Sequence, residues 1–311
     1  MLLSVKNLNV SYGDILVVRD VSLEVEEGEV VGIVGESGCG KSTMLHALMQ
    51  LDPNISAKSE TYLFDGEDLD HFGEEDWRRL RGKKMAMIFQ NAEMAMDPMK
   101  KIAHQFYETV RMHEKKRKKI QCLKCAEEWM KKLNLSDTKR ILNSYPYELS
   151  GGMCQRIAIA VAMMNDPKLI LADEPTSALD VTSQAEAVKT MIQLKQQYHT
   201  SMILVTHNMG VVAQLADKVG VMYGGEMVEW GTTAEILKTP AHPYTRALLD
   251  AIPKMDGTIS EGIAGKPPEY GKERKGCVFA PRCMYKKEEC ESGKINCYER
   301  SKTHWVRCKA S

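Results

Sequence analysis

A glycine-rich stretch near the N-terminus has the residue types and spacing of a phosphate-binding loop. The stretch GESGCGKS follows a short apolar run and precedes a segment with helical spacing. Backbone N–H groups of such a loop, with the start of the following helix, can surround nucleotide phosphates. A lysine adds charge for the β- and γ-phosphates, and the next hydroxyl can bind Mg²⁺. The motif predicts nucleotide contacts from Gly35, Ser37, Gly38, Cys39, Gly40, Lys41, Ser42 and Thr43.

Two adjacent carboxylates follow a second apolar run. The sequence LILADEP predicts a buried strand that ends at Asp173, and parallel sheets present ligand-binding groups at the carboxyl ends of their strands. Asp173 would hold Mg²⁺ through its water shell. Glu174, one residue further, would polarise an attacking water as general base. Together with the glycine-rich loop, this pair predicts a P-loop ATPase.

A third motif, LSGGMCQR, places Ser150, Gly151 and Gly152 at the start of a predicted helix. A hydroxyl and exposed glycine N–H groups at a helix start form a second anion site. Since the chain already has its own phosphate loop, this site is best explained if it serves the γ-phosphate held by another subunit.

The elements around these motifs alternate between strands and helices, which predicts an α/β fold with a mainly parallel sheet. Residues from about 92 to 165 interrupt the alternation with helical spacing, and the basic run Lys115–Lys119 predicts a solvated helix face there. Gly224 and Gly225 predict a hairpin turn. From Pro253 onward, glycine, proline and charge predict a linker, which a cysteine-rich tail follows.

Composition limits the class of protein. The chain has 42 basic and 42 acidic residues among 311, so its net charge gives no reason to expect a nucleic-acid partner. We expect neither a signal peptide nor a membrane-spanning helix. In a reducing cytoplasm, clustered cysteines are more typical of metal ligands than of disulfides.

In this order, the motifs strongly resemble the ATP-binding subunits of ABC transporters, over residues 1 to about 255. The resemblance implies that Tyr12 stacks on adenine and that Gln90 contacts Mg²⁺ and water. It implies that Asp180 communicates across a dimer and that His207 contacts the γ-phosphate. Cys154 departs slightly from the commonest signature, beyond the Ser-Gly-Gly itself.

The resemblance also implies a fold and a set of partners. The fold would be a P-loop ABC ATPase domain over residues 1–255, with a RecA-like core, an antiparallel β subdomain and an α-helical subdomain. A small cysteine-rich extension would follow over residues 256–311. The partners would be a second, non-identical ATPase subunit, two transmembrane permeases and an extracytoplasmic solute-binding protein. The chain would lie at the cytoplasmic face of the inner membrane.

The tail resembles the C-terminal region of ATPases from the oligopeptide, dipeptide and nickel branch of ABC importers. By that resemblance Cys277, Cys283, Cys290 and Cys308 bind a [4Fe–4S] cluster, and Cys297 is the alternative fourth ligand. Zinc is a second interpretation, because four thiolates can hold either zinc or an iron–sulfur cluster. Unligated thiols are the third. A structural role is favoured over redox sensing, because the tail is too short to build its own core.

The sequence therefore predicts an ATP-hydrolysing subunit of an importer for peptides or a related small solute such as nickel. A non-transport ABC ATPase of the translation or DNA-repair type is the alternative. A metal-binding regulator that kept an ATPase fold is less favoured, because Glu174 and His207 are intact.

Overall fold

The computed structural model describes residues 1–177, 179–252, 262–272, 274–293 and 295–309. The chain divides into two compact units. Unit 1 comprises Met1–Glu26, Val30–His71 and Val205–Ser311, and unit 2 comprises Glu27–Glu29 and Phe72–Leu204. The predicted boundary at residues 255 and 256 lies outside the described residues. Within those ranges, no helix has the length and apolar character needed to cross a bilayer.

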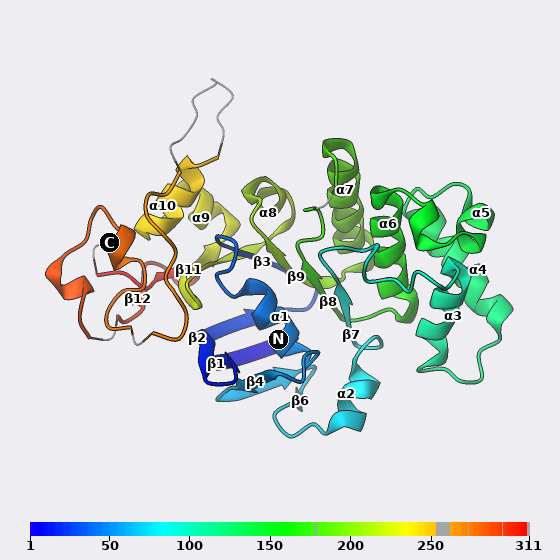
Figure 1. Cartoon of the computed structure of the whole chain (residues 1–311), viewed down its shortest axis with the longest axis horizontal. Coiled ribbons are helices and arrows are strands. Elements are labelled where there is room, and N and C mark those ends of the chain that lie inside the picture. Colours follow the sequence, from blue (N-terminus) through cyan, green and yellow to red (C-terminus); the bar gives the residue numbers. More distant parts are fainter. Residues whose placement is uncertain (178, 253–261, 273, 294, 310–311) are drawn as a thin grey trace. The chain divides into compact units, whose positions relative to one another are not determined.

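Unit 1 begins with an antiparallel sheet (Figure 1). Its strands are β1 (Leu3–Tyr12), β2 (Ile15–Val25), β4 (Ile55–Lys58), β5 (Thr61–Phe64) and β6 (Glu67–Asp68). The strand order is β2-β1-β5-β6, with β4 also paired to β1. The tight connection between β1 and β2 leaves Tyr12 opposite Ile15 at the end of the hairpin. The sheet therefore presents the aromatic ring of Tyr12 at an exposed edge.

A second set of strands in unit 1 carries the phosphate loop. It comprises β3 (Val30–Val34), β10 (Lys218–Tyr223), β11 (Glu226–Thr232), β12 (Tyr298–Glu299) and β13 (Trp305–Val306). Strand β3 is parallel to β10, whereas β10–β11, β11–β13 and β13–β12 are antiparallel. Gly224 and Gly225 join β10 to β11 with φ values of 54° and 90°, a region that favours glycine. The predicted hairpin is confirmed.

The helices of unit 1 are short and flank these strands. They are α1 (Lys41–Leu48), α8 (Met209–Leu215), α9 (Thr233–Lys238), α10 (Pro243–Asp250) and the 3₁₀ turns Ala280–Arg282 and Glu288–Cys290.

Unit 2 contains most of the helices (Figure 1). They are α2 (Glu74–Leu80), α3 (Ile102–Arg111), α4 (Lys119–Lys132), α5 (Thr138–Asn143), α6 (Gly151–Ala162) and α7 (Val181–Tyr198), with 3₁₀ turns at Pro146–Glu148 and Met163–Asn165. Strand β7 (Met85–Ile88) runs parallel to β8 (Leu169–Asp173), and β9 (Ser201–Thr206), most of which lies in unit 2, neighbours β8. All residues of β8 and β9 are buried, as predicted for strands inside a parallel sheet.

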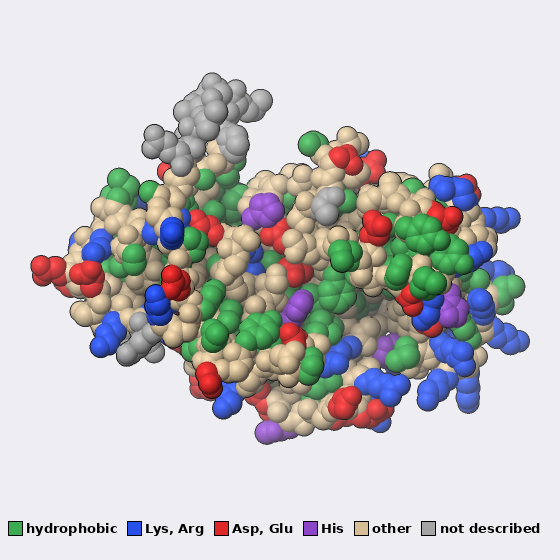
Figure 2. Space-filling model, in the orientation of Figure 1, with side chains coloured by type: hydrophobic (Ala, Val, Ile, Leu, Met, Phe, Trp, Pro, Cys, Tyr) green, Lys and Arg blue, Asp and Glu red, His purple; other side chains and the backbone are tan. Residues whose placement is uncertain are grey.

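The basic run is exposed, as predicted, but most of it precedes the helix. Helix α4 begins at Lys119, and Lys115, Lys116 and Lys118 lie exposed in the preceding loop. Figure 2 shows lysine and arginine side chains gathered on the surface of this helical part.

The C-terminal segment packs on unit 1 instead of forming a separate core. The Glu229 carboxylate on β11 is fully buried and accepts backbone N–H groups of Ala241 and His242 at 2.7 and 2.9 Å. The ring Nε2 of His304 lies 2.7 Å from the same carboxylate. Val306 is also fully buried and clusters with Ala241. Buried polar contacts of this kind hold the tail in one position.

A second carboxylate fastens the tail at the start of α9. Burial opposes ionisation of Glu235, but hydrogen bonds from Ser301, Thr232 and Thr303 outweigh it and lower the pKa of this carboxyl to about 2. An acid whose pKa is depressed by folding stabilises the protein above its unfolded pKa. That stabilisation is lost as the pH falls toward the folded value.

We therefore expect Glu235→Gln to lower the free energy of unfolding by about 1 kcal/mol at pH 7, a value reduced by solvent screening. The difference from the native chain should shrink between pH 4.5 and about pH 2, as urea unfolding at a series of pH values would reveal. Glu288→Gln, at an exposed site in the same tail, is the control. A Glu235→Gln deficit that stays constant with pH would contradict the assignment.

Candidate functional site

The predicted phosphate loop connects β3 to α1, and its first glycine has no room for a side chain. A Cβ on Gly35 would lie 2.1 Å from the carbonyl oxygen of Met222 on β10 and 2.8 Å from the thiol of Cys39. Gly40 has φ of 100° immediately before α1, a conformation that L residues rarely adopt. The glycines therefore let the loop turn tightly against β10 before the helix begins.

Lys41 and the loop backbone form the cationic part of this site. The Lys41 ammonium is buried and donates hydrogen bonds to the carbonyl oxygens of Gly35 and Glu36, each at 2.9 Å. Ser37 and Gly38 are exposed at the tip of the loop, whereas Ser42 and Thr43 are half-buried in α1. Exposed backbone N–H groups next to a buried ammonium and a helix start can bind an anion. Burial raises the pKa of the Cys39 thiol, so Cys39 packs as a neutral side chain.

Two tyrosines far along the chain also contact the loop, although no sequence motif marks them as site residues. The hydroxyl of Tyr244, on α10, accepts the backbone N–H of Glu36 at 2.8 Å. The hydroxyl of Tyr270 donates to the carbonyl of Gly38 at 2.8 Å. Neither tyrosine belongs to a recognisable motif, so their contacts with the loop could not be predicted from sequence.

In unit 2, Asp173 is the last residue of β8 and Glu174 follows it directly, as predicted. Asp173 and Glu174 are both buried, at 4% and 8% exposure. Glu174 has φ of 44°, a left-handed conformation that is uncommon for residues other than glycine. The backbone N–H and hydroxyl of Ser177 both donate to the Glu174 carbonyl at 3.1 Å. Glu174 therefore lies in a left-handed turn directly after β8, and such conformations are frequent at functional sites.

The Ser-Gly-Gly motif begins α6, as predicted. The Ser150 hydroxyl accepts the Met153 N–H at 3.3 Å and caps the helix. A Cβ on Gly152 would lie 2.6 Å from the Ser183 hydroxyl oxygen on α7. The Ser183 hydroxyl donates to Asp180 at 2.7 Å, and Asp180 in turn caps α7. Ser183 therefore links two predicted site residues, Gly152 and Asp180, through one side chain.

Cys154 points away from this motif. Its thiol is fully buried and donates to the carbonyl of Pro146 at 3.5 Å, and burial raises its pKa to about 11. The departure from the commonest signature therefore places a neutral side chain in the packing of α6.

The remaining predicted residues occupy exposed positions at the ends of strands. Gln90 lies two residues after β7 in unit 2, and His207 lies between β9 and α8 in unit 1. Both are exposed, and neither belongs to a helix or strand. Their positions just after buried strands are typical of ligand-binding groups in α/β proteins.

Comparison with known proteins identifies the family. A family model described as ABC transporter matches residues 18–177, and one described as Oligopeptide/dipeptide transporter, C-terminal region, matches residues 228–290. A dipeptide transport ATP-binding protein of Lactococcus lactis subsp. cremoris is 42% identical, over 90% of this chain and 82% of its own. The chain belongs to the ABC transporter ATP-binding proteins. The resemblance predicted from the sequence is confirmed.

Other relatives agree. A dipeptide transport ATP-binding protein of Bacillus subtilis is 40% identical over 98% of this chain and 93% of its own. An oligopeptide transport ATP-binding protein of Haemophilus influenzae is 38% identical over 93% and 91%. Among solved structures, a bacterial ABC transporter cassette determined as a dimer has a TM-score of 0.66 and 27% identity, over 75% of this chain and 99% of its own. The predicted ABC ATPase fold is confirmed, with mixed sheets.

The predicted iron–sulfur cluster is wrong. No group of three or more His, Cys, Asp or Glu side chains within the described residues could hold a metal ion. Burial is the largest cause that raises the pKa of Cys277 to about 11, with smaller contributions from Cys308 and Cys290, and burial also raises the pKa of Cys283.

Contacts within the protein hold the cysteine-bearing tail in place. Cys277 donates its backbone N–H to the Cys290 carbonyl at 2.8 Å, and Cys290 and Cys308 are buried. Cys297, the predicted alternative ligand, is exposed. A metal centre was expected because the tail is too short to build a core of its own. The tail instead shares the core of unit 1 through contacts such as those of Val306 and His304.

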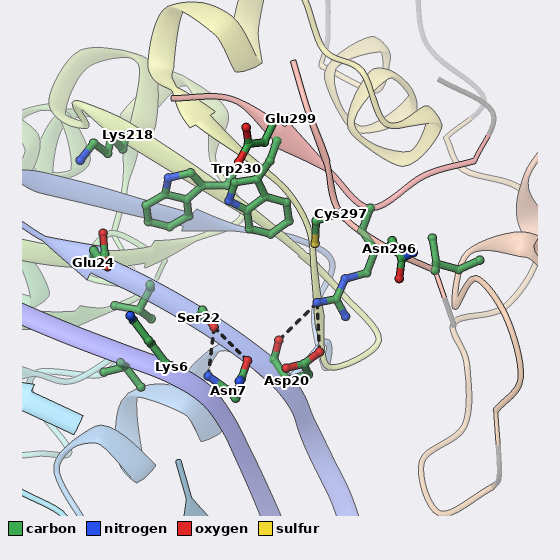
Figure 3. A pocket seen from close by; sticks show the side chains of 15 residues that line it. Lys6, Asn7, Asp20, Ser22, Glu24, Lys218, Trp230, Asn296, Cys297 and Glu299 are labelled. Atoms are coloured by element: carbon green, nitrogen blue, oxygen red, sulfur yellow. Dashed lines mark hydrogen bonds and ion pairs between the residues drawn. The ribbon is translucent and has the colours of Figure 1, made fainter. Parts of the chain in front are cut away.

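A separate pocket of about 550 Å³ lies between the first β-hairpin of unit 1 and the C-terminal segment (Figure 3). Lys6 and Glu24 come from β1 and β2, Trp230 from β11 and Cys297 from the tail. The pocket lining includes no residue of the phosphate loop. The cavity is therefore distinct from the nucleotide site and explains the exposure of Cys297.

The packing of α6 against α7 predicts different tolerances for the two glycines of the signature. Gly152→Ala should destabilise the fold by roughly 1–3 kcal/mol, because the added methyl group overlaps Ser183. Gly151→Ala is the matched control, since its Cβ would meet nothing closer than Leu179 at 3.7 Å. Thermal unfolding of both variants measures the difference. Equal midpoints for the two would contradict the close approach of α6 to Ser183.

Proposed function

We propose that this chain hydrolyses ATP to drive the import of dipeptides or oligopeptides. The observation that supports this most strongly is the match of residues 228–290 to the oligopeptide/dipeptide transporter C-terminal region, together with relatives that carry peptide transport names over nearly the whole chain. Nickel or another small solute is a less favoured cargo for the same machinery, because these relatives are named for peptides.

The phosphate loop would bind the triphosphate of ATP. Backbone N–H groups of residues 35–43 face the phosphates, and Lys41 exchanges its contacts with the loop carbonyls for contacts with the β- and γ-phosphates. The exposed ring of Tyr12 stacks on adenine. The loop shape and the buried ammonium support these assignments.

Mg²⁺ would be held by Ser42, Asp173 and Gln90. A hydroxyl, a carboxylate and an amide oxygen form the hard donor set that this ion prefers, so these residues fit it. The ion would neutralise charge on the β- and γ-phosphates. Asp173 is buried at the end of β8, where a parallel sheet presents ligand-binding groups.

Glu174 would accept a proton from the attacking water, and His207 would contact the γ-phosphate. Glu174 lies in a left-handed turn directly after Asp173, and the two adjacent carboxylates would serve two different roles.

A second ATPase subunit, which we propose to be a non-identical paralogue, would complete the site. Ser150, Gly151 and Gly152 would bind the γ-phosphate held by that subunit, since Gly151 is exposed at the start of α6. Asp180 would communicate across the interface between the two ATPase subunits. The division into residues 1–255 and 256–311 remains part of this proposal.

Closure of this dimer would be transmitted to two permease subunits through the helical region of about 92–165, which holds the chain at the cytoplasmic face of the membrane. An extracytoplasmic binding protein would deliver the cargo. No nucleic-acid partner is proposed.

The proposed general base gives a direct test. Glu174→Gln should bind ATP with nearly native affinity but lose more than about 99% of turnover, because only the proton acceptor is removed. Phosphate release by the assembled transporter and ATP binding by calorimetry measure the two effects. Glu67→Gln, at an exposed position of β6 outside the proposed sites, is the control and should hydrolyse ATP normally. Native turnover by Glu174→Gln would remove Glu174 from this role.

A further inference from the structure

One arginine of the C-terminal segment makes direct contact with the phosphate loop. The Arg282 guanidinium binds the Glu36 carboxylate through two parallel hydrogen bonds, Nη1 to Oε2 at 2.7 Å and Nη2 to Oε1 at 3.1 Å. Glu36 is the second residue of the loop, and 246 residues separate it from Arg282 in the chain. Paired bonds of this geometry fix both position and orientation.

The remaining donors of Arg282 are also used. Its Nε donates to the Ala264 carbonyl at 2.8 Å, and Nη2 donates to the Ile263 carbonyl at 2.8 Å. Nη1 also donates to the Tyr223 hydroxyl at 3.1 Å. All five N–H groups of the guanidinium therefore have acceptors, and the side chain is only 4% exposed. Arg282 is held rigidly between the C-terminal segment, β10 and the loop.

Three different side chains hold Glu36 in position. Its carboxylate binds Arg282, its N–H donates to Tyr244, and its carbonyl accepts from the Lys41 ammonium. The carboxylate also carries a negative charge on the loop where phosphates would bind. A pairing guanidinium offsets that charge, which would otherwise repel the nucleotide.

We propose that Arg282 is a positioning residue for ATP, which holds the phosphate loop in its binding conformation and neutralises Glu36. The proposal rests on the proposed role of residues 35–43 in ATP binding. It makes the C-terminal segment part of the nucleotide site, because the guanidinium that restrains the loop is fixed by the carbonyls of residues 263 and 264. Preorganisation of the loop lowers the entropic cost of binding.

The test is the binding of ATP with Mg²⁺ to the full chain by isothermal titration calorimetry. Arg282→Gln should weaken binding about tenfold, because it leaves the Glu36 charge unpaired beside the phosphates. Adding Glu36→Gln to this variant should restore binding to within about threefold of native, since the double variant has no unpaired carboxylate. A role limited to stability would not give this rescue.

Arg307→Gln is the matched control. Arg307 is also a poorly exposed arginine of the C-terminal segment, but its carboxylate partners are Asp20 and Glu226, outside the loop. It should bind ATP within about twofold of native. Arg282→Lys keeps the charge and should bind more tightly than Arg282→Gln, which provides a second variant if the glutamine variant folds poorly. Thermal unfolding without nucleotide reports on folding.

Three results would overturn the proposal: native affinity in Arg282→Gln, equal weakening in Arg307→Gln, or no rescue by Glu36→Gln. Lys41→Ala separates this outcome from failure of the proposed function. If Lys41→Ala loses binding while Arg282→Gln does not, the loop binds ATP and only the role of Arg282 is wrong. If Lys41→Ala binds ATP normally, the proposed nucleotide site is wrong.

Discussion

The close approach of the phosphate loop to β10 is the constraint on which the rest of unit 1 depends. Strands β3 and β10 are parallel neighbours, and a side chain at Gly35 would collide with the backbone of Met222, so only glycine allows the loop to approach β10 this closely. The hairpin that follows β10 is bound to the same loop, because the Gly225 N–H donates to the Cys39 carbonyl at 3.0 Å. Backbone contacts of this kind cannot adjust as side chains do, and they fix the loop before any ligand binds.

The C-terminal segment also helps to hold the phosphate loop in place. It contacts the loop through Tyr270 and Arg282, and it is fastened to β11 through His304 and Glu229. These contacts make the segment a part of unit 1 in packing terms. A tail that shares the core of its domain gains folding energy from apolar burial and buried hydrogen bonds.

The sequence predicted the features that depend on local spacing. The phosphate loop, the carboxylates after β8, the Ser-Gly-Gly at the start of α6 and the hairpin at Gly224 each follow from residues within one short stretch. Features that depend on long-range packing were missed. The pairing of Glu36 with Arg282 joins residues 246 positions apart, and neither residue is unusual locally. The contact between Gly152 and Ser183 likewise depends on how two helices cross.

The wrong prediction of an iron–sulfur cluster also arose because local spacing does not determine long-range geometry. Cysteine spacing was compared with a ligand pattern, but whether thiols hold a metal depends on their geometry and ionisation. Strands β12 and β13 were also not predicted, since each has two residues and no periodic pattern can be read from so short a run. Such strands exist only because β11 offers an edge for pairing.

Phosphate release by the transporter assembled in lipid vesicles tests the central claim most directly. The chain would be combined with its permeases, its second ATPase and the binding protein, and ATP hydrolysis would be measured with and without dipeptides and longer peptides. The account predicts that hydrolysis rises several-fold when the binding protein carries a peptide, because cargo delivery and nucleotide closure are coupled. Hydrolysis that no peptide changes, at any concentration of loaded binding protein, would contradict the account.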